Sequence, residues 1–247
     1  MQPELPRTSL NGSALVGLLA QLALVDRPLA TPSFVAGLGH WLSWKEAIPL
    51  SSALQAPLGA GRHAAQAGGP RQAASTTSAV VHDFAQLRDA LARAIADEAT
   101  TAREDGASFV PFRRRYFGLQ QSMQAAIGPL RVQARAAVAQ LAPSMNRLAA
   151  LDAVMADALA AHEQALLALM PVLLEKHFTR LRQAPQPAAP GTPWLEVFRA
   201  DMQRLLLAEL ELRLQPVLGL LDTLLDTPLD TPLNTRQAAQ PAPHQTS

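Results

Sequence analysis

The sequence has few of the residues on which many enzymes and disulfide-bonded proteins depend. It contains no cysteine, and aromatic residues make up 4% of its 247 positions. The absence of cysteine excludes disulfide bridges, thiol nucleophiles and thiolate metal ligands. It is also compatible with a reducing compartment, and we predict a cytoplasmic location.

The chain also lacks a strong net charge and a long apolar run. Its formal charge is +1, so no overall field attracts it to nucleic acid or to an acidic membrane. Polar residues interrupt the longest apolar stretches, residues 14–25 and 165–174, before the roughly 20 residues that a spanning helix needs. We therefore expect no membrane span.

Alanine and leucine dominate the hydrophobic residues, which make up 49% of the chain. Both are strong helix formers, and no segment has the alternation of a convincing strand. The sequence therefore predicts an all-α fold, in which a small N-terminal helical unit precedes an elongated antiparallel helical bundle with coiled-coil-like packing.

Changes in composition along the chain suggest six segments. Stretches rich in Pro, Gly and Ser cannot repay the entropy of ordering, so they are typical of linkers and tails. In chain order the predicted segments are an N-terminal three-helix unit (1–55), a flexible linker (56–78), a long-helix bundle (79–183), a proline-rich connection (184–193), a C-terminal amphipathic helix (194–225) and a disordered tail (226–247).

The longest apolar pattern runs from Ser144 to about Leu181 and predicts one long helix with a bend at Pro171. Its apolar positions recur at alternating steps of three and four, which is the seam of a helix that packs lengthwise on others. The seam consists of Leu148, Leu151, Met155, Ala158, His162, Ala165, Leu169 and Val172. We expect a partner surface of similar length to cover it.

A second stripe of this kind lies on the last predicted helix. It consists of Leu195, Phe198, Met202, Leu206, Leu210, Leu214, Val217, Leu221 and Leu224. It would dock within the chain or on a second chain, because the two arrangements need the same pattern.

The sequence contains no recognised catalytic or metal-binding motif. It has no Gly-rich phosphate loop, no Gly-x-Ser-x-Gly elbow and no His-Glu-x-x-His. His162 and Glu163 begin such a zinc motif, but Leu166 stands where the second histidine belongs. Neither Glu163 nor Glu175 begins the Glu-x-x-His pair of a di-metal bundle. We predict that the protein is not an enzyme and uses no cofactor and no metal ion.

The segment 109–117, Phe-Val-Pro-Phe-Arg-Arg-Arg-Tyr-Phe, has the most unusual local chemistry. Arg113, Arg114, Arg115 and Tyr116 are candidate contacts for a partner or a phosphate, because guanidinium groups bind phosphates while rings stack on bases. In a simpler interpretation the rings close the end of a bundle and the arginines point outward to acids. Three arginines are too few for tight nucleic-acid binding by charge alone.

Trp41 and Trp44 lie in the predicted N-terminal unit and are candidate anchors for a partner, because large rings are common at binding centres. The alternative is that they fill the core of that small unit.

Three blocks of the sequence carry a resemblance to a known family. They are Gly-Ser-Ala-Leu-Val at residues 12–16, Leu-Gly-His-Trp-Leu at residues 38–42 and Phe-Arg-Arg-Arg-Tyr at residues 112–116. The chain resembles an uncharacterised family of proteobacterial proteins of unknown function. The resemblance implies a bacterial, cytoplasmic protein and supplies no catalytic residues.

These patterns favour a non-enzymatic helical scaffold or adaptor that mediates protein–protein association. Its partner would be another protein or a second copy of the chain in a homo-oligomer. The alternative is a nucleic-acid or phosphate-binding protein that uses the arginines at 113–115.

Overall fold

Every regular element that the computed structural model describes is an α-helix. The described residues are 14–24, 44–55, 70–101, 108–142, 144–185 and 193–226, and no strand occurs in them. The helices are α1 (Ala14–Gln21), α3 (Trp44–Gln55), α4 (Pro70–Thr101), α5 (Val110–Leu141), α6 (Met145–Leu167), α7 (Met170–Gln183) and α8 (Pro193–Asp226). The predicted all-α class is confirmed.

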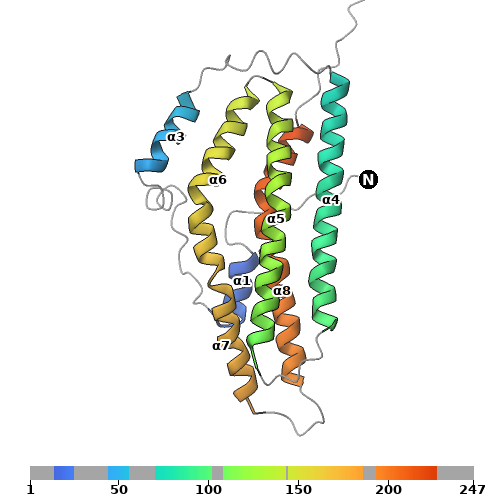
Figure 1. Cartoon of the computed structure of the whole chain (residues 1–247), viewed down its shortest axis with the longest axis vertical. Coiled ribbons are helices and arrows are strands. Elements are labelled where there is room, and N and C mark those ends of the chain that lie inside the picture. Colours follow the sequence, from blue (N-terminus) through green and yellow to red (C-terminus); the bar gives the residue numbers. More distant parts are fainter. Residues whose placement is uncertain are drawn as a thin grey trace, which may run out of the picture.

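Four long rods lie side by side and alternate in direction (Figure 1). They are α4, α5, the pair α6–α7, and α8. Helices α4, α5 and α8 pack against one another in all three pairs, whereas α6 packs against α5, and α7 packs against α8 and α5. Helices α5 and α8 therefore form the centre of the bundle, with α4 on one side and α6–α7 on the other.

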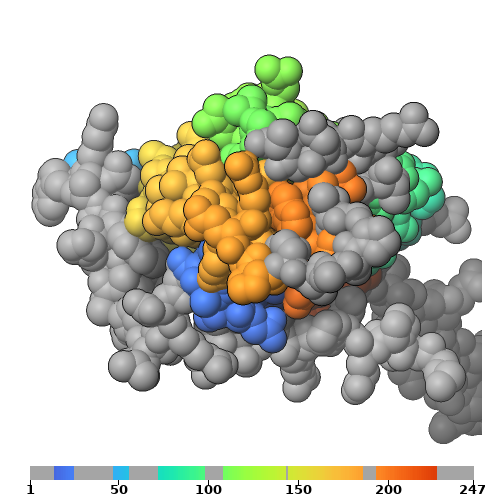
Figure 2. Space-filling view, turned by 90° about the horizontal axis from the view of Figure 1, so that it is seen from below, coloured from blue at the N-terminus to red at the C-terminus, as the bar shows by residue number. Residues whose placement is uncertain are grey.

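The two short helices lie on this bundle at separate places. Helix α1 packs against α8, and α3 packs against α6 beside its upper half (Figure 1). Seen from below, α1 adjoins α7 (Figure 2). The segment boundaries drawn from composition stay predictions. The second helix predicted in residues 1–55 and the predicted tail at 227–247 lie outside the described residues.

Helix α4 begins at Pro70, inside the range 56–78 that composition assigned to a linker. Proline fits the first turn of a helix, because its φ is preset and no donor is needed there. The hydroxyls of Ser75 and Thr76 donate to the carbonyl of Gln72 at 3.0 and 2.9 Å. These small polar residues are therefore satisfied within the helix, so residues 70–78 are helical although their composition resembles a linker.

The stripe predicted on the last helix is buried within the chain. None of its residues is more than 4% exposed, and they pack in one core with Val80, Phe84 and Ile95 of α4 and the apolar face of α5. The last helix therefore docks in cis.

Aromatic rings fill the lower end of the bundle. Phe198 lies 5.1 Å from both Phe112 and Phe178 between ring centroids, with interplanar angles of 82° and 83°. Phe109 and Trp194 extend the cluster. Such edge-to-face pairs add about 0.5–1.5 kcal/mol each to the burial of the rings. The interpretation that these rings close the end of the bundle is confirmed for Phe109 and Phe112, which are buried.

The single long helix predicted from Ser144 is divided into α6 and α7 at Ala168 and Leu169. Both residues keep right-handed helical angles, so α7 continues in the general direction of α6 (Figure 1). The helix is thus interrupted just before Pro171, near the position of the predicted bend. Helices α5 and α8, by contrast, continue through Pro129 and Pro216 without interruption.

Candidate functional site

The described residues cover the seam predicted on α6 only in part. None of its residues is buried, and Leu148, Leu169 and Val172 are 40%, 51% and 50% exposed. In α6 as a whole only Ala149 and Leu167 are buried. The predicted stripe of α8 is fully buried, whereas α6–α7 leaves part of its predicted seam in water.

One stripe carries this exposed surface along both helices. It consists of Ala161, Ala165, Ala168, Leu169 and Val172, all exposed, and it ends at Asp157 and Lys176. Steps of three and four place these residues on one side of the rod. We call this stripe the open face. Leu166, which is 50% exposed, borders it.

A shared carboxylate holds the opposite side of α6 against α5. Asp152 accepts hydrogen bonds from Arg131 at 3.1 and 2.6 Å and from Arg135 at 3.0 Å, and these side chains are 16–21% exposed. Burial alone would raise the pKa of Asp152, but the hydrogen bonds and charges of both arginines outweigh it and lower that pKa. The resulting ion pairs fix the rotation of α6, so the open face points away from α5.

Beneath the α6–α7 break lies Glu209 of α8, a carboxylate with 0% exposure. Tyr116 donates to its Oε2 at 2.8 Å, and Gln120 donates to both oxygens at 3.0 Å. Arg213 bonds Oε1 through Nε at 2.9 Å and through a terminal nitrogen at 2.8 Å. These charge-assisted bonds offset the cost of burying the carboxylate, which is several kcal/mol for an isolated ion.

Gln120 also forms a hydrogen bond to the backbone at the break between α6 and α7. Its Nε2 donates to the carbonyl of Leu167 at 3.1 Å. In a regular helix that carbonyl would accept from the N–H of residue 171, but Pro171 has none. The amide of Gln120 therefore replaces the missing donor. This bond connects the bend in α6–α7 to the buried carboxylate of α8.

Tyr116 belongs to the interior rather than to the surface. Its ring is 0% exposed. Burial raises the pKa of its phenol well above the ordinary value, the charge of Glu209 and the hydrogen bond to it act in the same direction, and Arg213 opposes them. Tyr116 was a candidate contact for a partner or a phosphate; in the structure its hydroxyl and its ring are both enclosed by the bundle.

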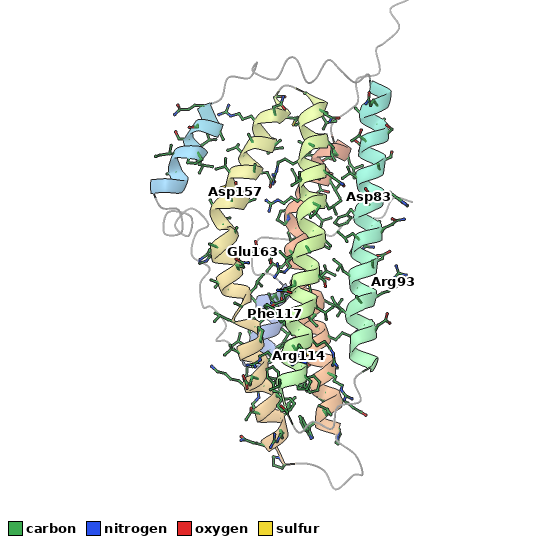
Figure 3. All side chains as sticks on the ribbon, viewed as in Figure 1. Asp83, Arg93, Arg114, Phe117, Asp157 and Glu163 are labelled. Atoms are coloured by element: carbon green, nitrogen blue, oxygen red, sulfur yellow. The ribbon has the colours of Figure 1, made fainter. Side chains whose placement is uncertain are left out.

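The three neighbouring arginines lie at the surface of α5. Arg113 and Arg114 are exposed, and the guanidinium of half-buried Arg115 lies 5.9 Å from the ring centroid of Phe112. Phe117, which is 54% exposed, lies one turn from Arg114 (Figure 3). The candidate contacts are therefore divided: the arginines face outward, whereas Tyr116 faces inward.

The two predicted tryptophan anchors lie beyond what can be described. Trp41 lies outside the described residues. Trp44 begins α3, but its side chain is likewise not among those described.

A second polar cluster fastens the end of α1 to α7. His177, which is 3% exposed, lies 2.9 Å from Asp201 of α8 through Nε2. Arg180 bonds Nδ1 of His177 at 2.8 Å and also the carbonyls of Leu22 and Ala23. Because a guanidinium only donates, Nδ1 accepts and Nε2 carries the hydrogen donated to Asp201. The cluster therefore joins α7 to α8 through His177 and to the end of α1 through Arg180.

The described residues contain no group of three or more His, Asp or Glu side chains that could hold a metal ion. The groove between α1 and α8 has a volume of about 620 Å³ and is open, and Arg204 and Glu211 line it together with small residues such as Gly17. The polar clusters above therefore serve packing, and the open face is the best candidate for a functional surface.

Within the described residues one stretch, Met145–Gln183, is by length and composition alone suited to cross a membrane. The stretch includes Asp152, which is held in ion pairs to two arginines of α5. Its apolar surface coincides with the open face.

A protein-family model, described as Protein of unknown function (DUF3348), matches residues 1–226. This agrees with the resemblance to a family of unknown function. No curated protein and no solved structure matches the chain. The bacterial origin and the cytoplasmic location stay predictions.

Replacing Gln120 with leucine should lower the free energy of unfolding by about 1–3 kcal/mol, because the buried carbonyl of Leu167 loses its donor. In a Pro171→Ala background residue 171 regains an N–H for that carbonyl, so the same change should cost about 1 kcal/mol less. Urea unfolding of the four proteins, followed by circular dichroism, measures this coupling. Equal costs in the two backgrounds would show that Gln120 does not serve the carbonyl.

Tyr116 is the only tyrosine of the chain, so phenolate absorbance reports on it alone. An unfolded tyrosine ionises near pH 10, whereas the raised pKa keeps the folded phenol protonated at that pH. Above about pH 10 the folded state therefore binds more protons than the unfolded state, and stability should fall as the pH rises. An absorbance titration should show ionisation only with unfolding; the urea-unfolded chain is the control. Ionisation of the folded protein near pH 10 would contradict the buried hydrogen bond to Glu209.

Proposed function

We propose that this chain, which belongs to the family of proteins of unknown function (DUF3348), is a non-enzymatic helical scaffold that binds another protein through the open face. The observation that supports this proposal is the contrast between two predicted stripes. That of α8 is buried in cis, whereas that of α6–α7 has no buried residue and four of its eight residues are exposed. A helix with this periodicity is stabilised by lying against another helix, and the described residues supply none over the open face.

The energy of such binding is small for each residue and depends on length. Burying a side chain that is about half exposed contributes roughly 1 kcal/mol, half the value for a fully exposed leucine or valine. Leu166, Leu169 and Val172 together therefore supply only about 3 kcal/mol, less than association costs in lost freedom. The partner must follow the stripe beyond these three residues, which favours another long helix over a short peptide. The exposed alanines allow the backbone of that helix to approach closely.

The open face is also preorganised, which reduces the cost of binding. Asp152 fixes the rotation of α6 through Arg131 and Arg135. The bend is held by Gln120 from inside the bundle. A partner would therefore meet a surface whose backbone is already in place.

A photo-crosslinking residue introduced at Leu169 in the full chain tests this proposal in cells. Illumination should join the chain to a protein, because Leu169 lies in the centre of the open face. The matched control is Val132 of α5, an apolar position with 58% exposure against 51% for Leu169. We expect protein adducts from position 169 and none from position 132.

Two other outcomes would contradict the scaffold. Adducts to lipid alone at position 169 would show that this surface meets a membrane. The absence of adducts at position 169 under conditions in which the protein is folded would show that the surface stays in water.

A second candidate is the predicted binding of nucleic acid or phosphate, which the exposure of Arg113, Arg114 and the nearby ring of Phe117 favours. Two exposed guanidinium groups beside an aromatic ring form a small site for a phosphate and a stacked base. The burial of Tyr116 weakens this candidate, because it removes one of the two rings next to the arginines.

We expect the double variant Arg113→Ala/Arg114→Ala to bind a labelled single-stranded oligonucleotide as weakly as the wild type, since two charges give little affinity at physiological salt. Fluorescence anisotropy at several salt concentrations measures this. If the wild type binds tightly, and the variant loses affinity while its plot of log affinity against log salt becomes shallower by about 1.4, the nucleic-acid function is correct.

A further inference from the structure

We propose that the partner of the open face is a second copy of this chain, which lies antiparallel across a twofold axis between Leu166 and Leu167. This inference rests on the proposed function and names its partner. It is argued from the spacing of the open face and from the two charges at its ends.

The spacing of the open face is the same when read from either end. Its central line consists of Asp157, Ala161, Ala165, Ala168, Val172 and Lys176, which are separated by steps of four, four, three, four and four. A twofold interface requires that when one position contacts another, the second contacts the first in return. The symmetric steps meet this requirement about a point midway between residues 166 and 167.

In that arrangement small residues face larger ones or each other. Ala161 lies opposite Val172 of the partner, and Ala165 lies opposite the partner's Ala168. The two alanines at the centre let the helices approach, and Leu169 and Leu166 flank them. Leu169, which lies beside this line, would bury much of the half of its surface that is exposed in one chain.

Steps of four also determine how the two rods cross. Side chains four positions apart form a ridge inclined to the helix axis, and two such ridges interdigitate when the axes are inclined by about 50°. At this angle the two stripes run along each other although the helices themselves cross. Asp157 and Lys176 are nineteen positions apart, so the contact would be about 28 Å long at 1.5 Å per residue.

The charges at the ends of the open face are opposite and unused. Asp157 and Lys176 are exposed, and neither forms an ion pair or a hydrogen bond with another described residue. The twofold axis places Asp157 of each copy opposite Lys176 of the other, at both ends of the contact. Exposed pairs of this kind add little affinity but determine the orientation and register.

The exposed acid next to Lys176 disfavours a register shifted by one position toward the N-terminus. Glu175 precedes Lys176 and is also exposed. If the axis passed through Leu166, Asp157 would lie opposite the partner's Glu175, and two like charges would meet at each end. The register midway between residues 166 and 167 avoids this contact.

Light scattering of the full chain, measured during size-exclusion chromatography over a range of concentrations, tests the dimer. We expect the mass of two chains rather than the 26.4 kDa of one. The variants Asp157→Lys and Lys176→Asp should each weaken dimerisation roughly tenfold, because each places like charges at both ends. The double variant Asp157→Lys/Lys176→Asp restores both pairs and should dimerise like the wild type. Recovery by the second charge change is a result that a merely destabilising substitution would not give.

The matched control is Asp83→Lys on α4, which makes the same change of charge at an exposed position on the other side of the bundle (Figure 3). It should leave the dimer unchanged. A wild type of one-chain mass at every concentration would overturn the inference, as would single variants that dimerise normally or a double variant that does not recover.

The outcomes also separate this inference from the proposed function. If crosslinking at position 169 yields an adduct with a different protein while the purified chain has the mass of one copy, the second copy is wrong and the scaffold stands. If no protein adduct forms at that position, the scaffold is wrong as well. Binding of the one-chain form to vesicles of mixed neutral and anionic lipid would assign the open face to a membrane and overturn both.

Discussion

The arrangement of the bundle depends on compensating one buried negative charge. Glu209 lies at 0% exposure where α5, α8 and the α6–α7 break meet. An ion in that position costs several kcal/mol unless donors surround it, and Tyr116, Gln120 and Arg213 are those donors. Shifting α5 along α8 by one turn would separate the donors from the carboxylate. Apolar packing alone tolerates such shifts, because leucine stripes are nearly equivalent from one turn to the next, so the carboxylate network selects the register.

The same network stabilises the backbone where the rod α6–α7 is interrupted. Pro171 leaves the carbonyl of Leu167 without a helical donor, and Gln120 supplies one while it bonds Glu209. The bend therefore has a fixed position instead of being a flexible joint. Together with the ion pairs of Asp152, this determines which side of α6–α7 meets water. The surface chemistry of the open face is thus a consequence of polar contacts on the inner side of the same helices.

The apolar stripe of α8 could be predicted from the sequence, because helical periodicity depends only on local spacing. The role of Tyr116 could not, since its partner Glu209 is 93 positions away and no local pattern connects them. A partial signal did exist: Glu209 stands among buried leucines and four positions before Arg213, where an acid is either exposed or paired. The early start of α4 was missed for a different reason, because hydroxyl groups that bond their own helix resemble linker residues in composition.

Periodicity shows that a face needs a cover, but it does not show which molecule supplies that cover. The predicted stripes of α8 and α6–α7 are alike in sequence, yet the first is buried in cis whereas no residue of the second is buried. Three rods that contact one another in all pairs already enclose a core, so a fourth rod can be held on one side only. The outer side of that fourth rod is then free to bind a helix from outside, and the charges at its two ends restrict which helix fits. A surface with opposite charges at equal distances from its centre is complementary to an antiparallel copy of itself, because each charge then lies opposite the other kind. The charges of the open face therefore favour a second copy of the chain.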